Sequence, residues 1–232
     1  MRTTLLILAA LLAGTLCAQD KRELKFTAHD TVFLANYYGN KLYYADTTVA
    51  NAKGVTLFNR TSGYKPGVYA LVIPGPKYFE FLVNEPAVEM KSDTGALNEH
   101  LTVVRSKENQ LFLAYVHFLG DKKTEADAVT KRMDATQDPI AKAAAKEQLK
   151  KMESEVLAYQ NNLVQENPGT YAASIVRMSI APEQKEIRKA DGTVDSSATY
   201  YNYRAHFWDN TDLKDPKNLR TPVFQNKFDE YI

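Results

Sequence analysis

Two different periodicities divide this chain. Up to about residue 92, short apolar runs rich in Val, Tyr, Phe, Leu and Thr alternate with turn pairs such as Gly39-Asn40, a pattern that predicts strands. From Ser106 onward, apolar residues recur every three or four positions, which predicts helices. We therefore expect an α+β protein, in which an antiparallel β-sandwich over residues 19–95 precedes an α-helical region over residues 96–232.

Seven segments of the N-terminal part are predicted to be strands of an immunoglobulin-like sandwich. They are residues 23–28, 31–38, 41–49, 54–61, 67–74, 78–84 and 87–93. In the sixth segment, Phe79, Phe81 and Val83 form a uniformly apolar set, whereas the alternate positions are mixed. The strand is therefore expected to bury one face and to leave the other half exposed to solvent.

The helical part begins with a predicted antiparallel hairpin of two long helices over residues 107–166. Asp138 is a typical N-cap and Pro139 suits the first position of the second helix, while Gly120-Asp121 is expected to bend or interrupt the first. The second helix carries an apolar seam of Ala145, Leu149, Met152, Val156, Tyr159 and Leu163. Shorter helices are expected at residues 170–180 and 199–210.

A last helix is predicted to begin at Pro222. Phe224, Phe228 and Tyr231 follow it at helical spacing, and no stop signal ends the run before Ile232. We expect these three rings to lack a partner and residues 222–232 to fray. The unfinished pattern also predicts that the chain is a fragment of a longer protein.

The first eighteen residues are expected to be an export signal. Met1-Arg2 supply a positive start, and the segment from Leu5 to Leu16 is almost wholly apolar but too short to span a membrane comfortably. Cleavage after Ala18 predicts a protein of the periplasm or cell envelope with no transmembrane segment. Lipidation at Cys17 is the lesser alternative, because Leu16 stands where a lipoprotein signal needs a small residue.

Cleavage changes the charge and the thiol content. One of the 29 basic residues is lost with the signal, so the basic residues then equal the 28 acidic ones in number, and the only cysteine is lost as well. A formally neutral chain lacks the basic surface of a nucleic-acid binder. Without a thiol, the remaining residues form no disulfide, carry out no dithiol chemistry and build no thiolate metal site.

The remaining chemistry-bearing residues predict neither a catalytic centre, nor a metal site, nor a cofactor site. The four histidines, His29, His100, His117 and His206, lie far apart in the sequence, and His117 is expected to be a partly buried helix residue. The pairs Glu153 with Glu155 and Asp212 with Asp215 are expected to be solvated. No GxSxG, P-loop or GxGxxG sequence occurs.

One segment gathers residues that suit a binding surface. They are Tyr200, Tyr203, Arg204, His206, Trp208 and Asp209. Their aromatic rings suit stacking on a sugar or a peptide, with the polar members supplying hydrogen bonds. The favoured interpretation is different: aromatic residues at helical spacing usually pack into a core. A hydrolase that uses His206 with Asp209 or Asp212 is the remaining alternative.

Two short patterns concern modification of an exported chain. Asp30-Thr31-Val32 and Asp46-Thr47-Thr48 are similar to an O-glycosylation signal of some Gram-negative periplasms, which makes Thr31 and Thr47 candidate sites. The alternative interpretation is that both are ordinary strand residues.

The order of these segments resembles a known family. An export signal, a β-rich segment with "PGVYAL", then "SKENQLF", a helical hairpin and "HFWDNTDL" with "LRTPVFQNK" resemble the N-terminal region of envelope thioredoxin-like proteins of the TlpA/ResA type. In that family, a β-sandwich and a helical domain of unassigned function precede the thiol-disulfide oxidoreductase domain. The resemblance covers essentially the whole chain after residue 18.

The resemblance implies an accessory role. The family's CxxC and its redox domain are absent from these residues, so no catalytic residue is carried over. The chain is expected to be a non-catalytic module that positions its own downstream redox domain, recognises a protein client or contributes to a homodimer. The alternative is a stand-alone envelope protein that binds a glycan or a peptide.

Overall fold

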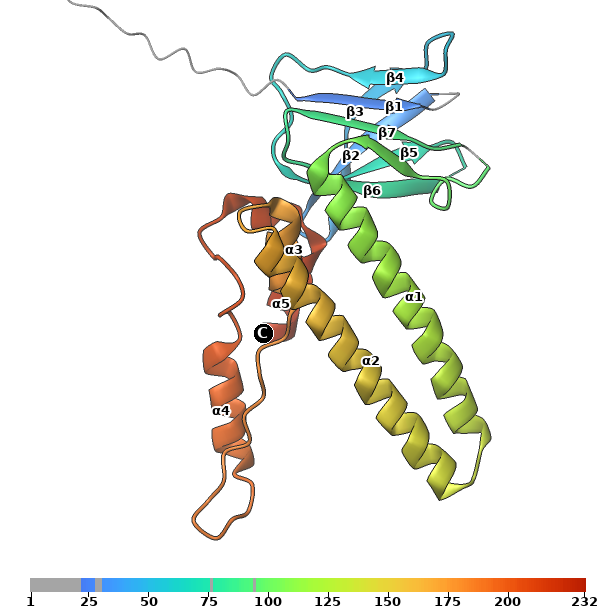
Figure 1. The fold of residues 1–232 in the computed structure, drawn as a ribbon. Coiled ribbons are helices and arrows are strands. Elements are labelled where there is room, and N and C mark those ends of the chain that lie inside the picture. The colour runs from blue at the N-terminus through green and yellow to red at the C-terminus, as the bar shows by residue number, and fades with distance from the viewer. Residues whose placement is uncertain (1–21, 28–30, 76, 94) are drawn as a thin grey trace, which may run out of the picture.

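The computed structural model describes residues 22–27, 31–75, 77–93 and 95–232 of the chain (Figure 1). The predicted export signal and Cys17 lie outside these residues. The fold is α+β, with two four-stranded sheets followed by a helical region, as the sequence predicted. No helix within the described ranges combines the length and the apolar composition needed to cross a membrane.

The two sheets have different strand orders. The first runs β4 (Val55–Phe58), β1 (Glu23–Thr27), β7 (Ala87–Lys91) and β8 (Thr102–Arg105). The second runs β3 (Lys41–Val49), β2 (Thr31–Tyr38), β5 (Gly67–Ile73) and β6 (Lys77–Val83).

The sheets pack against each other around one apolar core. Phe26 of β1 lies near the middle of it, and its ring centroid is 5.0 Å from that of Phe81 and 5.9 Å from that of Phe79, both on β6. Leu24, Leu34 and Phe81 are fully buried. Removal of this apolar area from water is the main force that holds the two sheets together.

Two features of the sheets differ from the sequence-based expectation. An eighth strand, β8, pairs with β7, so the sheet continues ten residues past the expected end at residue 95, to Arg105. The sandwich is also not wholly antiparallel, because β1 pairs with β7 in parallel. β8 has only four residues next to a helical pattern, and the direction of pairing between strands distant in the chain leaves no local sequence signal.

The two faces of β6 behave as the alternation predicted. Phe79, Phe81 and Val83 are buried in the sandwich core, whereas Tyr78 on the opposite face is 45% exposed. Leu82 shares that second face but is fully buried, because it packs with Tyr171 of the helical region.

The helical region contains five α-helices and one 3-10 helix. Their bounds are α1 (Lys107–Ala135), α2 (Pro139–Glu166), α3 (Tyr171–Ser179), α4 (Ser196–His206), η1 (Pro216–Arg220) and α5 (Pro222–Tyr231). The predicted hairpin is confirmed, since α1 and α2 run in opposite directions and contact each other (Figure 1).

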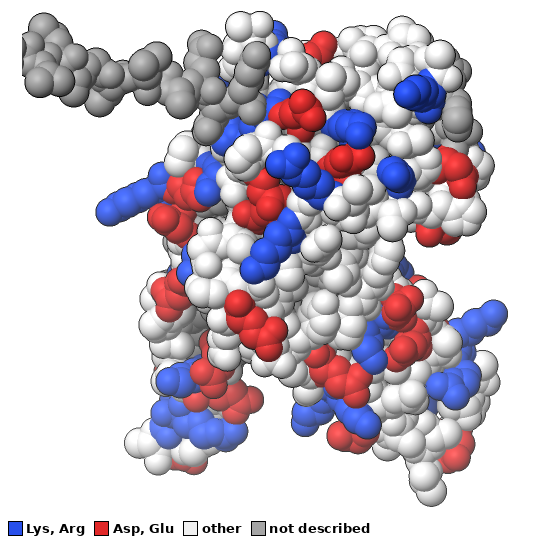
Figure 2. Space-filling view, turned by 45° about the horizontal axis from the view of Figure 1, so that its top comes forward, with Lys and Arg blue, Asp and Glu red and all other residues white. Residues whose placement is uncertain are grey.

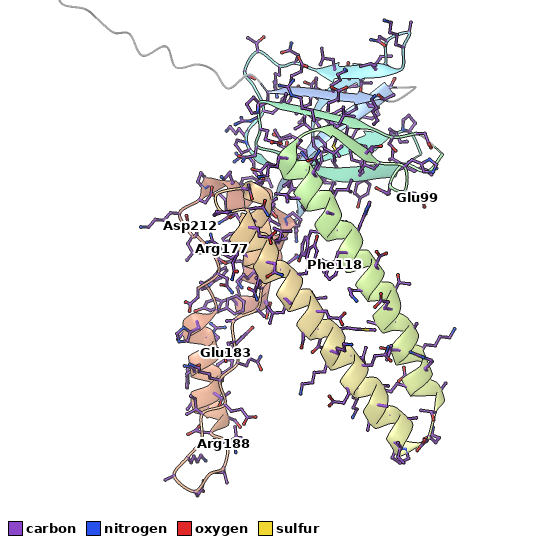
Figure 3. The ribbon with its side chains drawn as sticks, viewed as in Figure 1. Glu99, Phe118, Arg177, Glu183, Arg188 and Asp212 are labelled. Carbon is purple, nitrogen blue, oxygen red and sulfur yellow. The ribbon has the colours of Figure 1, made fainter. Side chains whose placement is uncertain are left out.

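The first helix of the hairpin is not interrupted at Gly120-Asp121, contrary to the expectation. α1 continues through both residues to Ala135. A glycine inside a helix costs about 1 kcal/mol relative to alanine, which contacts with α2 offset. The ring of Phe118 stacks on that of Tyr159 at 4.0 Å, and Lys122 bonds Glu155 of α2 at 2.7 Å. Figure 3 shows Phe118 between the two helices.

A buried carboxylate connects the sandwich to the helices. The side chain of Glu108 in the first turn of α1 accepts hydrogen bonds from the backbone N–H groups of Tyr171 at 3.0 Å and Ala172 at 2.8 Å. It therefore satisfies two of the unpaired amides at the start of α3, where a negative charge is favoured. Asn84, which follows β6, donates to the same carboxylate at 2.8 Å.

The side chain of the next residue, Asn109, bonds the edge of β6 as a neighbouring strand would. Asn109 accepts a hydrogen bond from the N–H of Leu82 at 2.6 Å and donates to its carbonyl at 2.8 Å. Ser106 caps α1 by accepting from the N–H of Asn109 at 3.0 Å. The stretch "SKENQLF" thus forms a joint between the two regions, which we call the joint of Ser106, Glu108 and Asn109.

The C-terminal segment reinforces this connection. The N–H of Gly39, in the turn between β2 and β3, donates to the carbonyl of Leu219 in η1 at 2.9 Å. Gly67 of β5 lies so close to η1 that an added Cβ would stand 2.7 Å from the Cβ of Arg220. Only glycine permits this close approach of β5 to Arg220 without a shift.

Buried tyrosines predict a loss of stability at high pH. Burial raises the pKa of Tyr69 to about 12, against the opposing charges of Arg220, Arg22 and Arg60. An unfolded tyrosine ionises near pH ~10. Between these values the unfolded state has lost a proton that the folded state keeps, so this residue's contribution is complete below pH ~10 and falls by about 1.4 kcal/mol per pH unit above it.

The measurement is urea unfolding of the wild type and Tyr69→Phe at pH 9, 10 and 11. Tyr69→Phe is expected to lose stability less steeply above pH ~10, although it also loses the hydrogen bond to the Lys65 carbonyl, 2.8 Å long, at every pH. Equal slopes for the two proteins would contradict the assignment.

Candidate functional site

The aromatic segment selected from the sequence lies on α4 and in the turn that follows it. Asp195 starts the helix by accepting a hydrogen bond from the N–H of Ala198 at 2.9 Å. The helix ends at His206, earlier than the predicted residue 210, and residues 207–210 form a turn. This turn brings Phe207 and Trp208 against α5.

The rings of this turn form a small core with α5. Phe207 is buried, and its ring centroid lies 5.1 Å from that of Tyr231. Trp208 is half-buried, at 5.8 Å from Phe224 and 5.4 Å from Tyr231. Phe224 and Tyr231 therefore have partners, contrary to the expectation for the last helix, whereas Phe228 is 44% exposed.

Two cationic side chains, Arg204 and Lys227, lie over rings of this small core. The guanidinium carbon of Arg204 is 3.8 Å from the ring centroid of Tyr231, and this side chain also donates to the Tyr231 carbonyl. The ammonium group of Lys227 is 4.5 Å from the Phe207 ring. Lys227 is only 8% exposed, and burial lowers its pKa while Glu230 opposes the shift. Such cation–ring contacts stabilise a charge that water no longer reaches.

The polar members of the segment form surface contacts. His206 and Asp209 contact each other at 2.7 Å, and both side chains are more than half exposed. Asp212 accepts a hydrogen bond from the N–H of Lys214 at 3.0 Å within a turn. An exposed histidine–carboxylate pair is open to water, an environment that weakens its electrostatic effect on a bound substrate.

Of the six predicted surface residues, the structure thus packs three and exposes three. Tyr203, Arg204 and Trp208 contact α5, whereas Tyr200, His206 and Asp209 are exposed. Tyr200 also lies 5.8 Å from the exposed ring of Tyr201. The packing of Trp208 agrees with the favoured interpretation of the sequence and leaves Tyr200 and Tyr201 as the open aromatic surface.

The other sequence candidates have local roles. Glu155 contacts Lys122, and Asp215 accepts from the N–H of Lys217 at the start of η1. His100 pairs with Asp93 on the surface, which raises the pKa of His100. His117 is exposed on α1 rather than partly buried.

Neither candidate glycosylation site is tested by these contacts. Thr47 is exposed on β3, and Thr31 is half-buried at the start of β2. Asp46 accepts hydrogen bonds from the hydroxyl of Tyr64 at 2.6 Å and the N–H of Thr47 at 2.8 Å. Asp30 and His29 lie outside the described residues.

A groove that the sequence patterns did not predict lies between β6 and α1. Its volume is about 760 Å³. It is lined by residues 77–80 of β6, by residues 95–99 and 101 of the loop between β7 and β8, and by Phe112, Leu113, Val116 and His117 of α1. Three distant segments build it, so only the exposed, polar alternate positions of β6 give any hint of it in the sequence.

The loop side of the groove is held by its own hydrogen bonds. Asp93 accepts from the N–H groups of Gly95 at 2.9 Å and Ala96 at 2.8 Å, and it also contacts His100. Ser92 donates to the carbonyl of Leu97 at 2.5 Å. These contacts fix the shape of the loop, and Figure 3 shows Glu99 at one end of the sandwich.

No group of three or more metal-ligating side chains gathers anywhere in the part of the chain that the structure describes. Comparison of the sequence with models of known protein families and with curated proteins found no match.

Proposed function

We propose that this chain is a non-catalytic module of the bacterial cell envelope that holds or recognises another protein, in the context of a thioredoxin-like thiol-disulfide oxidoreductase. The observation that carries the proposal is the joint of Ser106, Glu108 and Asn109. It fixes α1 and α3 relative to the sandwich through buried hydrogen bonds. A fixed spacing between two surfaces is what a positioning module requires.

The shape of the molecule supports the same proposal. The α1–α2 hairpin and the α4 segment extend from the sandwich as two separate projections, and acidic and basic side chains are mixed on the face seen in Figure 2. Such arms offer a large area to a neighbouring domain or a client, while mixed charges give no strong field for a nucleic acid.

The first test is the nucleotide sequence beyond the codon for Ile232. An open frame that leads to a domain with a CxxC motif is the expected result. An immediate stop codon would overturn the accessory role and leave the second candidate, a stand-alone binder of a glycan or peptide, which the exposed rings of Tyr200 and Tyr201 favour.

The second test is insulin reduction with dithiothreitol as the electron source. The chain without residues 1–18 contains no cysteine, so it is expected to add nothing to the rate of dithiothreitol alone. A catalysed rate from these residues would contradict a non-catalytic role.

A further inference from the structure

The edge of β6 is partly covered by side chains. β6 is the last strand of its sheet, and β5 pairs with only one of its sides. Asn109 bonds both backbone groups of Leu82, which therefore point away from β5. Four residues earlier on the same strand, the carbonyl of Tyr78 accepts a hydrogen bond from the side chain of Asn98 at 3.5 Å.

Glu80 lies between these two covered positions. In an antiparallel strand every second residue directs its N–H and C=O to the same side. Because Leu82 and Tyr78 face away from β5, the N–H and C=O of Glu80 face away from it too. They lie in the segment of β6 that lines the groove described above.

The groove around Glu80 has an apolar wall on the side of α1 and a more polar wall on the side of the loop between β7 and β8. Leu113 and Val116 of α1 lie on one side, and Val116 is 44% exposed. The carboxylate of Glu80 accepts from the hydroxyl of Tyr37 at 2.5 Å, which fixes the side chain at the rim. The distance from Leu82 to Tyr78 along a strand is roughly 13 Å, enough for about three extended residues.

We propose that this groove binds an extended polypeptide segment, which adds as a short strand to β6 opposite Glu80. Only a polypeptide backbone presents donors and acceptors at the spacing of a strand edge. β3, at the opposite edge of the sheet, presents Tyr43 and Tyr44 to solvent but has no comparable wall of helix and loop. This proposal concerns a free peptide and does not depend on any downstream domain.

The test uses a defined peptide, acetyl-Lys-Val-Lys-Val-Lys-amide, whose lysines suit the carboxylates of Glu80 and Glu99 in the groove. Amide chemical shifts of the full chain are followed by NMR during its addition. Two control peptides carry methyl groups on backbone nitrogens. One is methylated at the backbone nitrogens of the three lysines, and the other at those of the two valines. The side chains are unchanged in both, but each control blocks a different edge of the peptide backbone.

Shifts are expected at residues 78–82 and 113–117, with the valine-methylated peptide binding like the original and the lysine-methylated peptide failing to bind. Equal binding of all three peptides, shifts confined to β3, or no shifts at millimolar peptide would overturn the proposal.

Variants of the protein give an independent control. Glu80→Pro removes the outward N–H without removing a bond to β5, and it is expected to abolish binding, whereas Glu80→Gln loses only the charge, keeps the N–H and is expected to keep most of the affinity. Val116→Arg fills the groove from the exposed side of α1 and is expected to weaken binding about tenfold or more, even if Glu80→Pro does not fold. Unchanged affinity of Val116→Arg would contradict the location.

Discussion

Replacing Glu108 with alanine is expected to lower the free energy of unfolding by about 3 to 5 kcal/mol, the range for removing one partner of a buried charged contact. Its carboxylate accepts from the backbone of Tyr171 and Ala172 and from the side chain of Asn84. Glu108 itself is only 6% exposed. Alanine would leave these donors unpaired in a place that water does not reach easily.

Urea unfolding followed by circular dichroism measures this loss. The matched control is Glu153→Ala on the exposed face of α2, which is expected to change stability by less than about 0.5 kcal/mol. Hydrogen exchange adds a local readout, since the amides of Tyr171 and Ala172 should lose their protection in Glu108→Ala. A loss no larger than that of Glu153→Ala would show that the joint contributes little.

The second large effect is expected in the sandwich core. Phe81→Ala should destabilise the protein by about 3 to 5 kcal/mol, because it removes a large buried ring and leaves a cavity. Phe81 is fully buried and lies within 6.2 Å, between ring centroids, of Phe26, Phe79 and Tyr69. Few relaxations can fill a space that is bounded by three rings.

Tyr78→Ala is the control on the same strand. Its side chain is 45% exposed, so its loss should cost less than about 1 kcal/mol. Thermal and urea unfolding of both variants measure the difference. Similar losses for the two positions would contradict the assignment of the buried face of β6.

Local pattern predicted most elements because their causes are local. The alternation of Phe79, Phe81 and Val83 predicted the buried face of β6, and Asp138-Pro139 predicted the start of α2, where the Asp138 side chain accepts from the N–H of Ile140. At Gly120-Asp121 the same reasoning failed, since contacts of α1 with α2 outweigh the low helix propensity of glycine.

The candidate sites were less predictable because they depend on distant contacts. The helical spacing of the aromatic residues indicated packing, but not that Trp208 packs against Phe224 and Tyr231 of α5. The groove at Glu80 combines β6, a loop and α1. Because its lining residues come from three segments, no local sequence pattern predicts the groove.

The α+β class, the order of the two regions and the helical hairpin follow from local sequence patterns, since periodicity and capping act over a few residues. Long-range contacts, in contrast, establish that β1 pairs with β7 in parallel, that Glu108 and Asn109 join the regions, and that the outer edge of β6 is covered at Leu82. These features depend on which distant segments share a core, and that choice is made by the burial of apolar surface across the whole chain.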